Sequence, residues 1–337
     1  MFRALMLGDM LCATPALRAL RGAWPQARIT LVGLPWTAGL ARRLDTIDDF
    51  EPFPGWPGLP ERPAPTLGEM VEFMERVRAH RFDLAIQLHG SGPLTNALVA
   101  NFGAARNAGF ASHGVWFPPQ DGARFAVWPE QGSEVLRLLG LTDHLGLARR
   151  GTQLDLPLWP GDHARARRLV PTDRAYAVVH AGAQLPSRRW PAGRFAAVAD
   201  RLAQAGLRVV LTGTPGEHGL VASVAVQMGQ PSLNVCGQTD LWTLGAVLSS
   251  AHVLVCNDTG LSHVAAALGT RSVVVACGSE TRRWAPLDTG RHQVLWQDMA
   301  CRPCTYRVCP IGHACAEGLS VERVAGAALE AVTGASP

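Results

Sequence analysis

The chain has 337 residues, of which 47% are hydrophobic and 17% charged, and its formal net charge is +4. This length exceeds what one hydrophobic core usually supports, so two domains are expected, and the composition excludes an intrinsically disordered chain. All 31 basic side chains are Arg, since the sequence contains no Lys. The positive excess is too small to indicate a nucleic-acid-binding protein, which usually carries a dense basic stripe.

The N-terminus lacks the charged, apolar and cleavage regions of a signal peptide, and no apolar run approaches the roughly 18 residues of a membrane helix. A cytoplasmic protein is therefore expected. Its Arg side chains and 10 Trp would suit peripheral contact with the inner-membrane surface.

The N-terminal half is predicted to alternate strands and helices. A strand over residues 2–7 should break at Gly8 and Asp9, and the next helix should be capped by Thr14 with Pro15 at its first position. The other predicted elements of this half are a strand over residues 27–32, a loop over 51–65, a helix over 67–80, a strand over 82–88, a helix around 94–99 and a loop over 112–134.

The same alternation starts again near residue 173. Strands are predicted over residues 175–180, 208–212, 252–256 and 272–276, and helices over 195–205, after Glu217, over 241–250 and over 261–268. Two such blocks predict an α/β protein with two Rossmann-like, doubly wound domains, over residues 1–160 and 173–337, with a Pro-containing linker over about residues 150–172. Ligands bind beyond the carboxyl ends of such strands, so a cleft between the facing domains is the expected site.

The strongest motif is Asn-Asp-Thr-Gly-Leu-Ser-His over residues 257–263, which follows an apolar strand and opens a helix. Backbone N–H groups and the helix dipole favour a phosphate at such a point. Thr259 adds a hydroxyl donor, Gly260 allows close approach, and His263 lies one turn further along. Ordinary helix capping by Asp258 or Thr259 is the alternative.

A second motif, His-Ala-Gly-Ala over residues 180–183, ends another predicted strand and is followed by Arg188 and Arg189. The small residues Gly182 and Ala183 would allow close approach of a diphosphate. Either Arg would neutralise the charge on a leaving nucleoside diphosphate. A tight turn followed by a solvated Arg pair is the alternative.

Two carboxylates also lie at predicted strand ends. Asp9 would take the proton from an acceptor hydroxyl as that hydroxyl attacks an anomeric carbon, whereas an Asx-turn is the alternative. Glu217 ends Gly-Thr-Pro-Gly-Glu over residues 213–217 and would accept hydrogen bonds from a ribose or sugar hydroxyl. A favourable acid at a helix N-terminus explains Glu217 equally well.

Other α/β enzyme classes lack their motifs. No Gly-x-Gly-x-x-Gly follows a strand, no Lys exists for a Walker motif, and no Gly-x-Ser-x-Gly is present. These absences disfavour dinucleotide oxidoreductases, P-loop NTPases and α/β-hydrolases.

Together the motifs resemble glycosyltransferase family 9, the lipopolysaccharide heptosyltransferases. The resemblance lies, in this order, in residues 8–11 with 14–17, residues 180–183 with 189–191, residues 258–263 and residues 282–286. It spans nearly the whole chain.

The resemblance implies a GT-B fold and inverting, direct transfer without a catalytic metal. The C-terminal domain would hold a nucleotide sugar, typically ADP-heptose, and the N-terminal domain an acceptor, typically Kdo or heptose on lipid A. Asp9 matches the family's proposed base. Arg188 stands where the family usually has a Lys, which keeps the charge but changes the geometry. The predicted donor-binding residues are Gly182, Ala183, Arg188, Glu217, Asp258, Thr259, Gly260 and His263.

Four cysteines crowd near the C-terminus, at Cys301, Cys304, Cys309 and Cys315, with His313 among them. Four thiolates suit tetrahedral Fe or Zn, and such a site would be structural because it leaves no position open for substrate. The cluster resembles the cysteine-rich finger of the autotransporter heptosyltransferases, an iron-binding branch of the family. Reduced free thiols and disulfides are the alternatives.

The sequence thus predicts an inverting glycosyltransferase that moves a heptose or related sugar from ADP-heptose to a lipopolysaccharide core acceptor. A protein heptosyltransferase that acts on autotransporters is one alternative. A non-catalytic scaffold that binds nucleotide sugars is a second, and a sugar-nucleotide epimerase of similar shape is a third.

Overall fold

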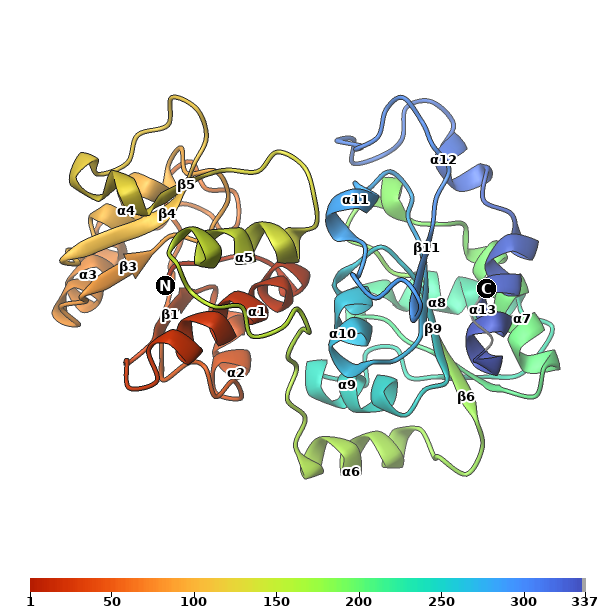
Figure 1. The fold of residues 1–337 in the computed structure, drawn as a ribbon. Coiled ribbons are helices and arrows are strands. Elements are labelled where there is room, and N and C mark those ends of the chain that lie inside the picture. The colour runs from red at the N-terminus through yellow and green to blue at the C-terminus, as the bar shows by residue number, and fades with distance from the viewer. Residues whose placement is uncertain (335–337) are drawn as a thin grey trace. The chain divides into compact units, whose positions relative to one another are not determined.

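The computed structural model describes residues 1–334 and divides into two compact units, Met1–Asp155 and Leu156–Pro337 (Figure 1). Both units consist of parallel strands with helices packed on them, which confirms the predicted α/β class. Within the described part of the chain, no helix combines the length and apolar character needed to cross a membrane.

The first unit contains two short sheets that the N-terminal residues join. Parallel bridges link Phe2 to Val32 on one side and to Gln87 on the other, so the start of the chain lies at the centre of the unit. The strands of this unit are β1 (Thr30–Gly33), β2 (Asp49–Pro52), β3 (Leu84–Ile86), β4 (Arg106–Ala111) and β5 (Phe125–Val127). The helices are α1 (Leu7–Ala23), α2 (Ala38–Ala41), α3 (Leu67–Ala79), α4 (Thr95–Ala100) and α5 (Glu134–His144).

The first predicted helix begins earlier than expected. Helix α1 starts at Leu7, so Asp9 lies in its first turn and not in a loop after a strand. Residues 2–6 lie outside the helix and pair with neighbouring strands at Phe2, and the error came from reading Gly8 and Asp9 as a break and Pro15 as the first helical position. Thr14 is not a cap. Its hydroxyl donates to the Leu11 carbonyl at 2.8 Å, which Pro15 inside the helix leaves without its usual N–H donor.

The core of the first unit contains four interlocking phenylalanines. Phe2, Phe53, Phe73 and Phe102 meet edge to face, with ring centroids 5.1–6.1 Å apart. All four are at most 2% exposed. Their packing ties the start of the chain to helix α3 and to the loop after β2, and therefore holds the segment that leads into Asp9.

The second unit is a six-stranded parallel sheet with the order β11-β10-β9-β6-β7-β8. Its strands are β6 (Tyr176–His180), β7 (Arg208–Leu211), β8 (Ser232–Asn234), β9 (Val253–Asn257), β10 (Ser272–Val275) and β11 (His292–Leu295). The chain runs outward from β6 to β8 and then returns to the other side of β6 with β9. The topological switch point of this sheet therefore lies between β6 and β9.

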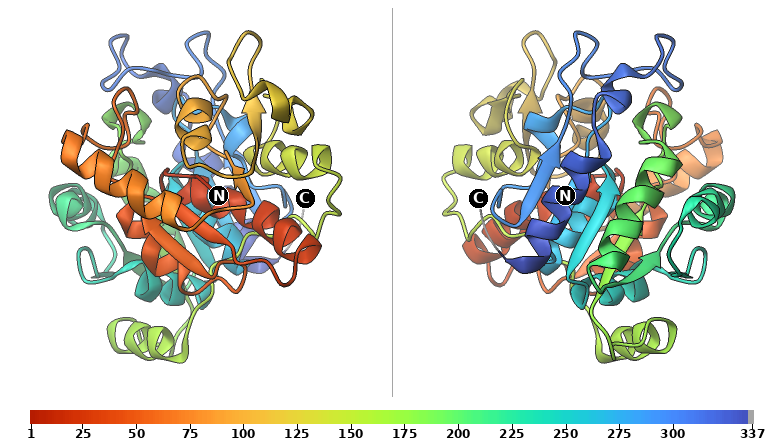
Figure 2. Two further views of the ribbon diagram at one scale, coloured as in Figure 1. Left: turned by 90° about the vertical axis from the view of Figure 1, so that its left-hand side faces the viewer. Right: turned by 90° about the vertical axis from the view of Figure 1, so that its right-hand side faces the viewer.

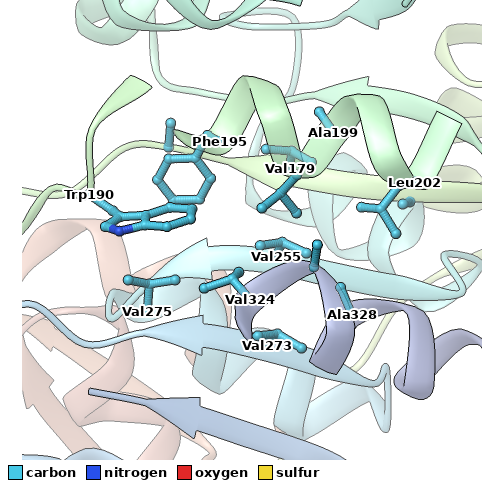
Figure 3. Close-up of a cluster of buried hydrophobic side chains, with 14 of the residues drawn as sticks. Val179, Trp190, Phe195, Ala199, Leu202, Val255, Val273, Val275, Val324 and Ala328 are labelled. Carbon is cyan, nitrogen blue, oxygen red and sulfur yellow. The ribbon is translucent and has the colours of Figure 1, made fainter. Parts of the chain in front are cut away.

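Helices cover both faces of this sheet. They are α6 (Pro160–Leu169), α7 (Ala192–Gln204), α8 (His218–Gln227), α9 (Leu241–Ser249), α10 (Gly260–Leu268), α11 (Thr281–Trp284), α12 (Ala314–Glu317) and α13 (Val321–Thr333). Helix α13 lies beside α7 on one face (Figure 2), while α9 and α10 lie on the other. Apolar side chains of β6, β9, β10, α7 and α13 form the core on the face that α7 and α13 cover. Its largest side chains are Trp190, which precedes α7, and Phe195 (Figure 3).

Two segments predicted as linker or loop contain regular structure. Residues 150–172 include α6, which packs against α9 and so belongs to the second unit. Residues 112–134 include strand β5 and a 3₁₀ turn, Pro119–Arg124. Both were missed because α6 is mostly polar and β5 is only three residues long, so neither shows hydrophobic periodicity.

His292 at the start of β11 makes the stability of the second unit depend on pH. The residue is 3% exposed, and its Nδ1 lies 2.9 Å from Ser272 Oγ. Burial lowers its pKa from 6.5 to about 4. In the unfolded chain His292 therefore binds a proton below pH 6.5, whereas in the folded chain it binds one only below about pH 4.

We expect the stabilising contribution of neutral His292 to be complete above pH 6.5 and to be lost as the pH falls towards 4. The loss amounts to roughly 3 kcal/mol. Urea unfolding of the wild type and of His292→Gln between pH 4 and 8 measures it. The Gln variant should show a correspondingly shallower dependence of unfolding free energy on pH, and an unchanged dependence would contradict this assignment.

Candidate functional sites

The two glycine-containing motifs flank the switch point of the second sheet. His180 pairs with Cys256 in register, so β6 and β9 end side by side. Gly182 and Ala183 follow β6, and residues 258–260 follow β9. Ligands of doubly wound sheets bind at this position, so the fold brings both sequence-predicted motifs to one place.

Asn257, the last residue of β9, joins the two strand ends. Its side chain is fully buried, donates to the Ala181 carbonyl at 2.7 Å and accepts the Trp190 N–H at 2.9 Å. A second, longer contact reaches the Gly182 carbonyl at 3.4 Å. Asn257 thus sets how the loop after β6 lies against the loop after β9. The sequence-based site prediction did not include it.

The helix that follows β9 begins as predicted, with Thr259 as its cap. The Thr259 hydroxyl accepts the Leu261 N–H at 3.3 Å, and Ser262 Oγ donates to the Thr259 carbonyl at 2.7 Å. The residues on either side of this cap, Asp258 and Gly260, are half-buried. The capping role is therefore present, and it leaves both neighbours partly accessible at the start of α10.

His263 lies one turn into α10 and is only 5% exposed. Its ring meets Trp284 of α11 edge to face, with centroids 6.1 Å apart. The contact connects α10 with the segment after β10, the neighbouring strand of the sheet. His263 is thus held in a fixed place beside the switch point.

Glu217 is a capping residue in this structure. Its carboxylate accepts the Thr214 N–H at 2.8 Å and the Thr214 hydroxyl at 2.9 Å, which completes a capping box. The same carboxylate lies against Gly182, where a Cβ would come within 2.1 Å of Glu217 Oε1. A side chain at position 182 would therefore displace the Glu217 carboxylate from its place beside the backbone.

His180, the last residue of β6, is buried beside Glu217. Burial lowers its pKa, and the nearby Glu217 carboxylate opposes that shift only in part. His180 Nδ1 lies 3.1 Å from Thr212 Oγ1 at the end of β7. The carboxyl ends of β6 and β7 are thereby tied together.

The structure distinguishes the two arginines after β6. Arg189 donates from Nε to the Ala183 carbonyl at 2.9 Å and shapes the loop. Arg188 ends the 3₁₀ turn Pro186–Arg188, and its buried Nε has no hydrogen-bond partner among the described residues. A buried donor without a protein partner is available to an ordered water or a bound anion. Arg188 is therefore the better candidate for a phosphate contact.

The cysteine-rich segment packs on the same turn. Ser187 donates its N–H to the Arg307 carbonyl at 3.1 Å and its hydroxyl to the Tyr306 carbonyl at 2.6 Å. The Ser187 carbonyl lies 2.8 Å from His313 Nε2. The conformation of the cysteine-rich segment therefore affects the position of Arg188, which follows Ser187.

The four cysteines of that segment do not form a ready ligand set. Among residues 1–334, no group of three or more His, Cys, Asp or Glu side chains is placed to hold a metal ion, and none of the eight cysteines forms a disulfide. Burial raises the pKa of Cys315, Arg302 opposes this, and Cys309 and Cys301 raise it further. These three thiols are electrostatic neighbours, and the predicted metal site with Cys304 stays a prediction.

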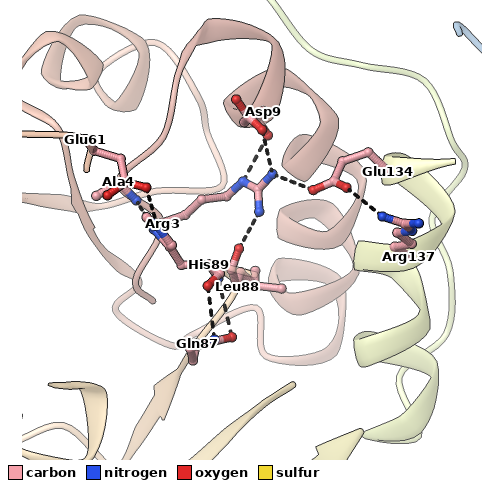
Figure 4. A network of polar contacts seen from close by, with 9 residues as sticks. All are labelled: Arg3, Ala4, Asp9, Glu61, Gln87, Leu88, His89, Glu134 and Arg137. Carbon is pink, nitrogen blue, oxygen red and sulfur yellow. Dashed lines mark hydrogen bonds and ion pairs between the residues drawn. The ribbon is translucent and has the colours of Figure 1, made fainter. Parts of the chain in front are cut away.

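In the first unit, Asp9 is held by Arg3. The Arg3 Nε donates to the Asp9 carbonyl at 2.9 Å, and Arg3 Nη2 lies 4.0 Å from Asp9 Oδ1 (Figure 4). Arg3 is fully buried, whereas the Asp9 side chain is 23% exposed. Arg3 therefore holds the backbone at Asp9, while the carboxylate is open at one side, as a group that exchanges protons with a substrate must be.

Two α/β units in one chain, with small residues at the switch point of the second, fit the two-domain GT-B fold. Residues 70–315 match the model of glycosyltransferase family 9 (heptosyltransferase). The chain belongs to this family, which confirms the resemblance seen in the sequence, and it is a glycosyltransferase.

Individual relatives agree with this assignment. The chain is 27% identical over 322 residues to lipopolysaccharide heptosyltransferase 2 of Escherichia coli (strain K12), which covers 87% of this chain and 89% of the relative. A family 9 glycosyl transferase from Veillonella parvula shares the fold with a TM-score of 0.80 at 20% identity, over 98% of this chain and 96% of that one. ADP-heptose lipopolysaccharide heptosyltransferase II of E. coli shares it with a TM-score of 0.75 at 20% identity, over 98% and 97% of the two chains.

Proposed function

We propose that this enzyme transfers a heptose from ADP-heptose to the core of lipopolysaccharide, in the cytoplasm and in contact with the inner-membrane face. The family and the name of the E. coli relative, which is 27% identical, support the sugar and the acceptor. That name favours lipopolysaccharide over a protein acceptor. The assignment of the donor site is supported mainly by one observation: Asn257 connects the ends of β6 and β9 at the switch point.

The reaction requires a base, a leaving-group site and a sugar site. In the proposed reaction an acceptor hydroxyl attacks the anomeric carbon, its proton passes to Asp9, and the bond from that carbon to the ADP oxygen breaks. ADP leaves with the electron pair of that bond, and Arg188 together with the N–H groups at the start of α10 stabilises its negative charge. Asp258 accepts hydrogen bonds from hydroxyls of the donor. The configuration at the anomeric carbon is inverted because the displacement is direct.

Calorimetric titration with ADP-heptose, ADP, UDP and GDP tests the donor site. We expect selective binding of the two ADP compounds, and about a tenfold or greater loss of affinity in Asp258→Ala and His263→Ala. Asp200→Ala is the control, because the Asp200 carboxylate on α7 accepts the N–H groups of Gly229 and Gln230 and lies outside the site. Tighter binding of UDP or GDP would remove heptose as the sugar, and no binding at all would leave the scaffold alternative.

We also propose that the cysteine-rich segment binds one structural Fe or Zn. The four thiols and the packing of their segment on Ser187 support this. Metal analysis of the purified protein should find about one ion per chain, and the double variant Cys301→Ser/Cys304→Ser should lose it. Donor affinity should fall in the same variant because Arg188 follows Ser187.

Cys12→Ala, in the first unit, is the matched control for these cysteine variants and should retain the metal. A protein free of metal, with full donor affinity in the double variant, would instead support four reduced thiols.

A further inference from the structure

Ser187, the residue before Arg188, is held by the cysteine-rich segment at each of its polar groups. The residue is only 3% exposed. Its N–H and its hydroxyl donate to the carbonyls of Arg307 and Tyr306, and its own carbonyl accepts a hydrogen bond of 2.8 Å from His313 Nε2. The position of Arg188 therefore depends on where these three partners lie.

The three partners differ in how firmly the fold holds them. Tyr306 is 53% exposed, and Arg307 is also exposed. His313 is half-buried and directly precedes helix α12, and its carbonyl accepts the N–H groups of Ala316 and Glu317 at 2.9 and 3.1 Å. His313 is therefore tied to a helix, whereas the other two partners lie in a solvent-facing stretch.

Helix α12 is itself anchored in the core of the second unit. The Trp190 side chain is buried and donates from Nε1 to the carbonyls of Ala316 and Leu319 at 3.2 and 3.3 Å. Through α12, His313 links this buried tryptophan to the Ser187 carbonyl.

The backbone of His313 adopts an uncommon conformation. Its φ is +59°, in the left-handed region, and within residues 1–334 Arg81 is the one other residue besides glycine with a positive φ. Such conformations are costly for a residue with a Cβ and are concentrated at functional sites. In this conformation the His313 N–H donates to Cys309 Sγ at 3.2 Å while the ring reaches the Ser187 carbonyl. A helix start by itself requires neither contact.

The contact from His313 acts on the arginine of this turn whose Nε is still available. The buried Nε of Arg188 has no hydrogen-bond partner among the described residues, whereas Arg189 Nε donates to the Ala183 carbonyl. The Ser187 carbonyl and the Arg188 nitrogen belong to one planar peptide group. A shift of that carbonyl would therefore move Arg188 with it.

We propose that His313 is a positioning residue of the donor site, which places the Arg188 guanidinium against the second phosphate of ADP by holding the Ser187 carbonyl. The inference rests on the proposed function, in which Arg188 stabilises the leaving ADP. The charge of that leaving group develops on the oxygen of the β-phosphate, because this phosphate was bonded to the sugar. Accurate placement matters because a hydrogen bond weakens steeply when donor and acceptor are misaligned.

Two substitutions of His313 separate the ring contact from the backbone. His313→Gln keeps a side-chain N–H at about the reach of Nε2, whereas His313→Asn tolerates the left-handed backbone but is too short to reach Ser187. Both keep the backbone N–H that donates to Cys309. By calorimetry we expect His313→Asn to lower the affinity for ADP about tenfold and His313→Gln to lower it no more than about twofold. Both variants should retain the metal content of the wild type.

Comparison of ADP with AMP gives a readout that a general loss of structure would not. AMP lacks the β-phosphate, so its affinity should be the same in the wild type and in His313→Asn. The double variant Arg188→Ala/His313→Asn should bind ADP no more weakly than Arg188→Ala alone, because His313 acts through Arg188. His144→Asn is the matched control. It removes a contact of 3.1 Å from His144 Nε2 to the Ala123 carbonyl in the first unit and should leave ADP affinity unchanged.

A second readout needs no ligand. The Arg188 Nε–H, assigned by NMR with Arg188→Lys, should exchange slowly with solvent in the wild type because it is buried, and about tenfold faster in His313→Asn. His313→Gly, which also removes the ring and suits the left-handed backbone, replaces His313→Asn if that variant does not fold.

Equal losses of ADP and AMP affinity, additive effects in the double variant, or unchanged exchange of the Arg188 Nε–H would overturn the inference. A different result would count against the proposed function alone. If Arg188→Ala binds ADP as tightly as the wild type while the exchange still responds to His313→Asn, the phosphate contact fails and the positioning of Arg188 by His313 stands.

Discussion

Asp9→Asn should reduce turnover by a factor of about 100 or more, because the amide cannot accept the proton of the attacking hydroxyl. The substitution keeps the size of the side chain and the backbone contact in which Arg3 donates to the Asp9 carbonyl. Donor affinity should remain at the wild-type value, since the predicted donor residues all lie in the second unit. A single-turnover assay with ADP-heptose and acceptor, together with calorimetry, separates the two effects.

Asp143→Asn provides the control for this substitution. Asp143 is an exposed aspartate of the same unit that pairs with Arg149, and its variant should retain full turnover. Unchanged turnover in Asp9→Asn would show that Asp9 is not the base, and retained cellular function without turnover would support the scaffold alternative.

Asn257→Leu should abolish measurable donor binding and destabilise the second unit by roughly 3 kcal/mol. The leucine has a similar volume but leaves the Trp190 N–H and the Ala181 carbonyl buried without their partner. Those two groups position the loop that carries Gly182 and Ala183, so the strand ends should separate. Urea unfolding measures the stability, and calorimetry with ADP measures the binding.

Asn96→Leu is the matched comparison for loss of a buried amide. Asn96 is 2% exposed and donates to the Trp116 carbonyl within the first unit. Its variant should lose stability while ADP still binds. Full ADP affinity in Asn257→Leu, or equal loss of ADP affinity in Asn96→Leu, would contradict the positioning role of Asn257.

Local patterns were sufficient for most of the second sheet and its strand ends. The predicted strands over residues 175–180, 208–212, 252–256 and 272–276 correspond to β6, β7, β9 and β10. Strands buried on both faces appear in the sequence as short apolar runs that are rich in β-branched residues and are followed by glycine. Such strands can therefore be predicted from local sequence. Strand β8 and helix α6 were not predicted, because β8 is only three residues long and α6 is mostly polar.

The sequence by itself determined the family, the α/β class of both units and the segments that carry the donor site, because these depend on motifs and patterns within a few consecutive residues. Only the tertiary structure decided which side chains hold those segments. Asn257 acts on residues 67 and 76 positions earlier, and Arg3 meets Glu134 across 131 positions. The contacts that fix the base and join the strand ends exist only after the chain has folded, so no local pattern could reveal them.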